Sequence, residues 1–147
     1  GQEGGGHLGR DDVGTFVLTP QVVDTVKIPV VASGGIGDGK GFMAALALGA
    51  EGIEMGTRFI ATKECVHAHE AYKQALLELE KNNPSFETLK PYIDGNANKR
   101  YIYDGNEREG FGWAGQVAAR IKDIPTVQEL FDQIIGEAIE IRKKWSL

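Results

Sequence analysis

The amino-acid sequence predicts an α/β domain built on parallel strands. There are two short apolar runs: residues 28–33, which Gly34 follows directly, and residues 52–56, which end in Gly56; a stretch with helical spacing lies between them. A continuous β-branched run such as the first is typical of a strand that is buried on both faces, as in a parallel sheet. Most of the 20 glycines lie in the first 56 residues, at the ends of apolar runs. They therefore indicate tight turns instead of a flexible linker.

The composition narrows the class of protein. The chain has 147 residues and a formal net charge of −5, which argues against a broad basic surface for nucleic acid or anionic lipid. The one cysteine, Cys65, cannot form an internal disulfide, and no apolar run approaches the ~20 residues that a membrane span needs. The first ten residues lack the basic leader and apolar core of a signal peptide. We therefore expect a cytoplasmic protein.

The front of the chain predicts one βαβ unit preceded by a helix. Thr19 followed by Pro20 predicts an N-cap and first position of a short helix that ends at residue 26. A strand over residues 28–33 follows, and residues 52–56 predict the second strand. Between the strands, Asp38 is suited to cap a helix whose apolar face recurs at helical spacing and consists of Phe42, Ala45, Leu46 and Gly49.

The rest of the chain is expected to be mostly helical. Thr62 is suited to cap a helix that ends before residue 82, and residues 84–124 predict an irregular segment with one short helix near 115–120. Thr126 and Glu129 have the spacing of a capping box. The closing helix that they begin is expected to bury Leu130, Phe131, Ile134, Ile135 and Ala138.

Glycine-containing loops predict a phosphate site. Ser33, Gly34 and Gly35 follow the first strand, and a second loop, Met55, Gly56 and Thr57, follows the next. In parallel α/β proteins ligands bind at the carboxyl ends of the strands, where glycines let backbone N–H groups approach an anion. The alternative is that these glycines only form tight turns. A near match to the P-loop from Gly34 to Lys40 fails because Gly41 replaces the hydroxyl residue that binds magnesium.

Histidines and the cysteine raise two further hypotheses. His7, in a glycine-rich loop that includes Gly5 and Gly6, could exchange a proton near neutral pH, although a loop histidine often only bonds to the backbone. Cys65, His67 and His69 invite a metal hypothesis. On a helix, however, only Cys65 and His69, which are four residues apart, would share a face, so these three ligands would not converge and no metal is expected.

Several segments together resemble the nitronate monooxygenase family, formerly called 2-nitropropane dioxygenase, which includes the flavin-dependent enoyl-acyl-carrier-protein reductases. The resemblance rests on Glu3-Gly-Gly-Gly-His-Leu-Gly9, Thr19-Pro-Gln-Val-Val-Asp24, Ile28-Pro-Val-Val-Ala-Ser-Gly-Gly-Ile36, Ala45-Leu-Ala-Leu-Gly-Ala50, Met55-Gly-Thr-Arg-Phe59 and Gly112-Trp-Ala-Gly-Gln116. It spans nearly the whole chain. The Gly-Gly-Ile and Met-Gly-Thr pieces alone also occur in other phosphate-binding barrels.

The resemblance implies an FMN-binding (β/α)8 TIM barrel, of which this chain is the C-terminal part with a mostly helical C-terminal extension. Residues 1–82 would be the last βα units, and residues 83–147 the irregular segment and closing helix of the same domain. The flavin phosphate would be held at Gly34, Gly35, Gly56 and Thr57, and His7 would be the active-site histidine. Gly5, Gly6, Ser33 and Met55 would also bind the cofactor. The implied reaction oxidises alkyl nitronates with O2 to carbonyl compounds; the alternative is reduction of enoyl thioesters by NAD(P)H.

Two departures from the family pattern accompany this resemblance. The family usually has alanine at Gly4 and glutamine at Glu54, so a carboxylate replaces a hydrogen-bond donor near the flavin. A closed barrel typically needs ~250 residues, which is more than this chain has. We expect either a missing N-terminal half or a second copy to complete the structure; a non-catalytic half-barrel remnant or dimerising module is the alternative of another class.

Overall fold

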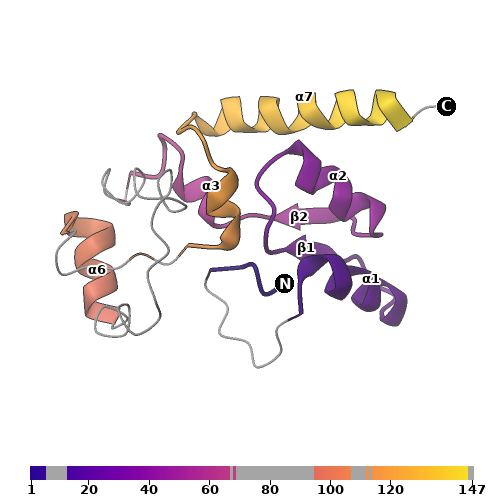
Figure 1. The fold of residues 1–147 in the computed structure, drawn as a ribbon, viewed down its shortest axis with the longest axis horizontal. Coiled ribbons are helices and arrows are strands. Elements are labelled where there is room, and N and C mark those ends of the chain that lie inside the picture. Colours follow the sequence, from indigo (N-terminus) through magenta and orange to yellow (C-terminus); the bar gives the residue numbers. More distant parts are fainter. Residues whose placement is uncertain (6–12, 67, 69–94, 107–111, 113, 146–147) are drawn as a thin grey trace.

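The computed structural model describes residues 1–5, 13–66, 68, 95–106, 112 and 114–145. In chain order the elements are α1 (Thr15–Thr25), β1 (Val31–Ser33), α2 (Gly39–Ala47), β2 (Gly52–Glu54), α3 (Thr57–Ile60), α6 (Gly95–Asp104), the 3-10 helix η2 (Gln116–Arg120) and α7 (Val127–Trp145) (Figure 1). The predicted order of helix, strand, helix and strand at the front of the chain is confirmed.

The two strands form the parallel pair that the sequence predicts. Ala32 lies opposite Ile53, and Ser33 lies opposite Glu54. Because this register aligns the carboxyl ends of the strands, the loops that follow them begin at the same edge of the sheet. The core beside the sheet consists of Ala32, Ile36, Ala45 and Ala50, with Ile53 and Met55 packed against them.

The first strand is shorter and less buried than its sequence predicts. It begins at Val31 instead of residue 28, and Val31 is 59% exposed whereas Ala32 is 4% exposed. Successive side chains of a strand point to opposite faces, so only the Ala32 face joins the core. The expectation of burial on both faces is wrong for the described residues, since β2 is the only strand there that pairs with β1.

Helix α1 begins five residues before the position that the sequence predicts. Its first residue is Thr15 and its N-cap is Gly14, so Pro20 lies inside the helix instead of at its start. The carboxylate of Glu3 accepts the backbone N–H of Thr15, which satisfies a donor at the start of the helix from outside the local sequence. This long-range contact is the physical reason for the wrong start.

Two of the other three predicted caps, Asp38 and Thr126, are confirmed. Asp38 accepts the N–H of Gly41 at 2.9 Å and caps α2. Thr126 and Glu129 exchange backbone-to-side-chain hydrogen bonds of 2.7 and 3.1 Å, which is the capping box of α7.

Figure 1 shows α7 lying along α2. The apolar stripe of α7 is only partly buried, because Leu130, Ile134 and Ala138 join the core whereas Phe131 and Ile135 are 48% and 47% exposed. On α2, Leu46 is 37% exposed.

The middle of the chain departs most from the sequence analysis. Thr62 does not begin a helix: residues 63–66 form turns, and Thr62 Oγ1 donates to the carbonyl of Phe59 at 2.7 Å. The remainder of that expected helix lies outside the described residues. Helix α6 was not predicted, because it depends on tertiary packing. Its Tyr101 and Ile102 pack against a buried cluster of Ala61, Ala68, Ala118 and Ile121. None of the helices described is long and apolar enough to cross a membrane.

Candidate functional site

One cavity of about 580 Å³ lies where the loops after β1 and β2 meet. This volume falls within the usual range for small-molecule and cofactor sites, ~300–1,000 Å³. Of the residues that the sequence analysis assigns to a cofactor, the structure brings seven to its wall: Gly5, Ser33, Gly34, Gly35, Met55, Gly56 and Thr57. The eighth, Gly6, lies outside the described residues, as does His7.

The loop after β1 requires glycine at two successive positions. Gly34 and Gly35 have φ angles of 104° and 73°, in the left-handed region that side chains rarely occupy. A Cβ at Gly34 would also lie 2.8 Å from the carbonyl oxygen of Gly1 and 2.9 Å from Thr15 Oγ1. The backbone therefore turns into the cavity without a side chain in the way, as an anion cradle requires.

The loop after β2 offers open space and an oriented hydroxyl. A Cβ at Gly56 would meet no atom within 4 Å, so the backbone here is accessible from the cavity. Thr57 is buried, and its Oγ1 accepts the backbone N–H of Gly115 at 2.9 Å. Because the oxygen serves as an acceptor there, the hydroxyl proton stays available for a second group.

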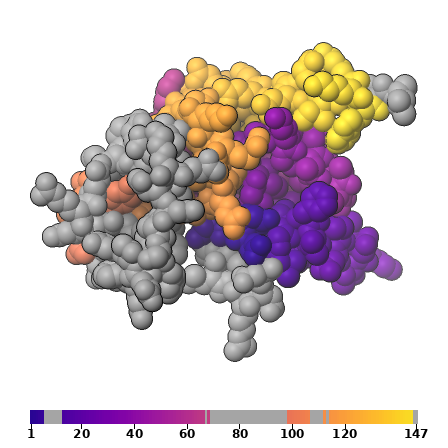
Figure 2. All heavy atoms as spheres, in the orientation of Figure 1, coloured from indigo at the N-terminus to yellow at the C-terminus, as the bar shows by residue number. Residues whose placement is uncertain are grey.

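The inner wall of the cavity comes from two segments that are distant in sequence. The carbonyl of Glu3 accepts the N–H of Gln116 at 2.9 Å, and a Cβ at Gly5 would lie 2.3 Å from the nitrogen of Gly115. Figure 2 shows the N-terminal residues, in indigo, against the orange segment that contains η2. Such close backbone contact leaves no room for side chains at Gly5 or Gly115.

Sequence reasoning missed part of this site. Glu3, Ile60, Gly115 and Val117 also line the cavity but were not among the expected site residues. Gly115 lies within the Gly112–Gln116 stretch that contributed to the family resemblance, so a signal for it existed. No local pattern indicated that this stretch would lie beside residues 3–5.

The described wall of the cavity carries carboxylates but no lysine or arginine. Its charged side chains are Glu3 and Glu54. Burial alone would raise the pKa of Glu3, but hydrogen bonds from the backbone and from Thr15 lower it below its ordinary value. A phosphate bound among the described residues would thus depend on backbone N–H groups and the Thr57 hydroxyl.

The start of α2 is not a second anion site. Gly39 N–H donates to Glu137 at 2.8 Å, and Gly41 N–H donates to Asp38. Asp38 also pairs with Arg120. Burial raises the pKa of Asp38, but the hydrogen bonds from Gly41 and Arg120 lower it overall. The carboxylates of Glu137 and Asp38 therefore already accept the N–H groups that would bind a nucleotide phosphate if this segment were a P-loop.

The metal hypothesis receives no support from the part of the chain that can be described. No group of three metal-ligating side chains occurs among those residues. Cys65 is partly buried, and both His67 and His69 lie outside the described ranges.

Comparisons with known proteins agree on one family. A family model for nitronate monooxygenase matches residues 1–102. A probable nitronate monooxygenase from Staphylococcus aureus (strain Newman) is 34% identical over 98% of this chain and 40% of its own length. The chain thus spans well under half of that curated relative.

Solved structures are similar over almost the whole chain. The M276A mutant of FabK from Thermotoga maritima matches with a TM-score of 0.87 and 34% identity, over 99% of this chain and 52% of that one. A nitroalkane oxidase from Streptomyces ansochromogenes matches with a TM-score of 0.77 and 27% identity, over 99% and 52%. The fold is therefore part of a (β/α)8 barrel, as the sequence analysis expects.

Proposed function

Because the chain belongs to the nitronate monooxygenase family, we propose that it forms the phosphate-binding part of an FMN-dependent enzyme that oxidises alkyl nitronates with O2. The family assignment supports a flavin-dependent oxidoreductase in general. The choice of FMN and of alkyl nitronate is the proposal. One observation carries it: the glycine loops after two adjacent parallel strands line a single cavity of about 580 Å³.

The residues present fit the phosphate end of FMN. Gly34 and Gly35 hold a left-handed backbone that a Cβ would block, and Gly56 faces open space. We assign the phosphate to backbone N–H groups of Ser33, Gly34, Gly35, Gly56 and Thr57, with the Thr57 hydroxyl as an additional donor. Gly5, Gly6 and Met55 are assigned to the remainder of the cofactor, since small residues leave room for a flat ring.

The chemistry divides between cofactor and protein. When bound, the flavin supplies the redox step, accepting electrons from the nitronate before O2 completes conversion to a carbonyl compound. His7 is assigned as the base that removes a proton from a neutral nitroalkane; a nitronate is already anionic and needs no such step. The described loops orient the cofactor by its phosphate.

Reduction of an enoyl thioester by NAD(P)H is the second candidate. The observation that favours it is the TM-score of 0.87 with FabK, against 0.77 with the nitroalkane oxidase. Both candidates use the same phosphate cradle. Turnover with alkyl nitronates and O2, compared with turnover of enoyl thioesters and NAD(P)H, distinguishes them.

A non-catalytic half-barrel or dimerising module is the candidate of another class. Exposed apolar side chains support a partner surface, among them Phe16, Ile28, Val31, Ile135 and Ile139. We propose that further barrel strands, from a longer chain or from a second copy, cover part of this surface. The oligomeric state measured by light scattering, together with flavin content, separates an enzyme part from a colourless module.

The test of the proposed function is the visible spectrum of the purified chain after incubation with FMN and removal of free flavin. A retained flavin spectrum is expected, in at most one equivalent per chain. A folded chain, verified by circular dichroism, that retains no flavin would contradict the proposal for these residues. The Gly34→Ala variant serves as the matched control, because flavin retained equally by this variant would be bound elsewhere.

A further inference from the structure

Arg58 follows directly after Thr57 in the proposed phosphate loop, yet its side chain points away from the cavity. Arg58 is only 4% exposed, and it lines a separate cavity of about 370 Å³ together with Asp123 and Gln133. It is absent from the wall of the proposed flavin cavity. Arg58 is therefore not a phosphate ligand in this arrangement, although it shares the short helix α3 with Thr57.

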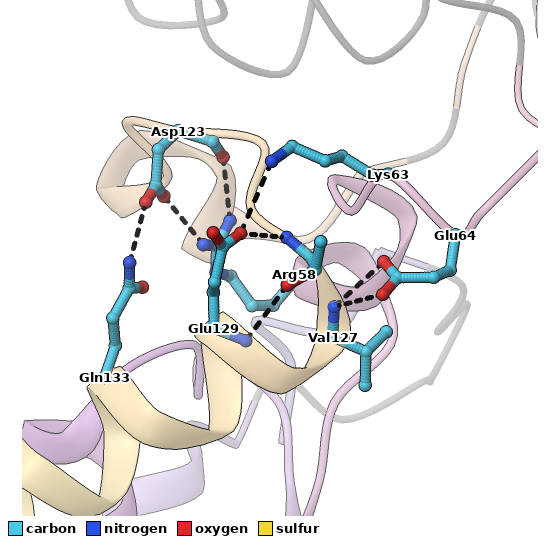
Figure 3. A network of polar contacts seen from close by, with 8 residues as sticks. Arg58, Lys63, Glu64, Asp123, Val127, Glu129 and Gln133 are labelled. Atoms are coloured by element: carbon cyan, nitrogen blue, oxygen red, sulfur yellow. Dashed lines mark hydrogen bonds and ion pairs between the residues drawn. The ribbon is translucent and has the colours of Figure 1, made fainter.

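The guanidinium of Arg58 is held at two points on one residue. Nη1 donates to the backbone carbonyl of Asp123 at 3.1 Å, and Nη2 donates to its Oδ1 at 2.7 Å. The second carboxylate oxygen, Oδ2, accepts Nε2 of Gln133 on α7 at 3.1 Å. Figure 3 shows these contacts converging on Asp123. A planar guanidinium fixed in this way can rotate or shift very little.

The side chain of Arg58 also lies beside the loop after β1. A Cβ at Gly37 would be 3.8 Å from both Cβ and Cδ of Arg58. Gly37 is two residues beyond Gly35, which lies in the other half of the proposed cradle. Arg58 is thus adjacent to both phosphate loops while it is anchored to the segment before α7.

We infer that Arg58 is a positioning residue that holds the Thr57 hydroxyl and the Gly56 backbone in register for the phosphate of FMN. This inference rests on the proposed function. Its basis is that Arg58 is the next residue after Thr57 in the chain and that Asp123 holds its buried side chain in place. A nearby contact, between Lys63 Nζ and Glu129 at 3.4 Å, joins the same two segments but is exposed on both sides.

The test compares FMN with riboflavin, which has the same ring but no phosphate. Dissociation constants for both are measured by flavin fluorescence with the wild-type chain and with Arg58→Lys. The lysine keeps the charge but cannot make the two-point contact that the planar guanidinium makes with Asp123. FMN affinity should fall by about tenfold or more, whereas riboflavin affinity should change less than about twofold.

Further variants separate positioning from stability. Asp123→Asn keeps the backbone carbonyl and one side-chain oxygen as acceptors for Arg58 and should retain most of the FMN preference, whereas Asp123→Ala should lose it. Lys63→Met removes the exposed contact and is expected to leave both affinities unchanged. Thermal unfolding of each flavin-free variant shows whether the fold persists.

The outcomes are distinct. An equal loss of FMN and riboflavin affinity in folded Arg58→Lys, or no loss of either, would refute the positioning role while leaving the proposed function intact. If Arg58→Lys does not fold, the folded Asp123→Ala variant decides by the same ratio. A wild-type chain that binds neither flavin would overturn both the proposed function and this inference.

Discussion

The carboxylate of Glu3 caps α1 through Thr15, a residue twelve positions further along the chain. Both carboxylate oxygens lie 3.0 Å from the Thr15 nitrogen, and Oε2 also lies 2.8 Å from the Thr15 hydroxyl. That hydroxyl lies 2.8 Å from the carbonyl oxygen of Gly34 as well. One side chain thus connects the N-terminal segment, the start of a helix and the loop of the proposed phosphate site.

Replacing Glu3 by alanine is expected to lower the free energy of unfolding by about 1 kcal/mol at pH 7, the usual cost of a lost helix cap. Because the pKa of Glu3 is lowered by folding, its contribution is complete above the ordinary value of 4.5 and is lost as the pH falls through the folded pKa. Urea unfolding at pH 7 and at acid pH measures both effects. Glu3→Gln should be less acid-sensitive than the wild type; an unchanged acid profile would show that this carboxylate does not contribute.

Gly34→Ala should destabilise the chain and reduce FMN binding. The φ of 104° and the 2.8 Å approach to the Gly1 oxygen both oppose a Cβ at this position. We expect a loss above ~1 kcal/mol in unfolding free energy and at least about a tenfold weaker FMN complex. Gly136→Ala is the control, since its Cβ would meet no atom within 4 Å inside α7. That change should raise stability by ~0.5–1 kcal/mol and leave FMN affinity unaltered.

Thr57→Val should weaken FMN binding more than Thr57→Ser does. Valine has a similar shape but leaves the N–H of Gly115 without its acceptor, which costs ~1–3 kcal/mol when the group is buried. Serine retains both the acceptor and the proposed donor to phosphate. Isothermal titration with FMN measures the loss of affinity, and thermal unfolding of the flavin-free variants measures the loss of stability, so the two effects can be separated. Equal FMN affinities for the valine and serine variants would exclude the hydroxyl from the phosphate site.

His7→Ala should impair turnover far more than flavin retention if His7 is the base. A neutral nitroalkane requires removal of a proton, whereas its nitronate does not, so the loss should be concentrated in the neutral substrate. The measurement is the steady-state rate with the neutral form and with the nitronate form of one nitroalkane, in an enzyme preparation that has activity. Parallel losses of turnover and flavin content would instead indicate a structural role.

The parts of the fold that depend on nearby residues could be predicted from the sequence. Asp38 and Thr126 cap helices within three or four residues of themselves, and the glycine loops follow directly from the strand register. The start of α1 could not be predicted, because Glu3 caps it from a separate segment. Helix α6 was missed for a similar reason, since Tyr101 packs against residues from both sides of it in sequence.

The same distinction applies to the candidate site. The residues after each strand were identifiable because parallel strands end at one edge. Gly115 reaches the cavity only by crossing the N-terminal segment, a contact that no local periodicity encodes. The orientation of Arg58 away from the cavity likewise depends on Asp123, 65 positions away. The local sequence pattern therefore does not predict these long-range contacts.

Glu54→Gln is expected to strengthen FMN binding. Glu54 ends β2 on the wall of the proposed cavity, where the described side chains include no lysine or arginine to offset its charge. Repulsion between this carboxylate and a bound phosphate should cost about threefold to tenfold in affinity at low salt and less at high salt. Titrations with FMN and riboflavin at two ionic strengths measure the effect, and riboflavin affinity should stay constant. Glu51→Gln removes an exposed carboxylate that does not line the cavity and serves as the control. Weaker FMN binding by Glu54→Gln would mean that the carboxylate itself holds the cofactor.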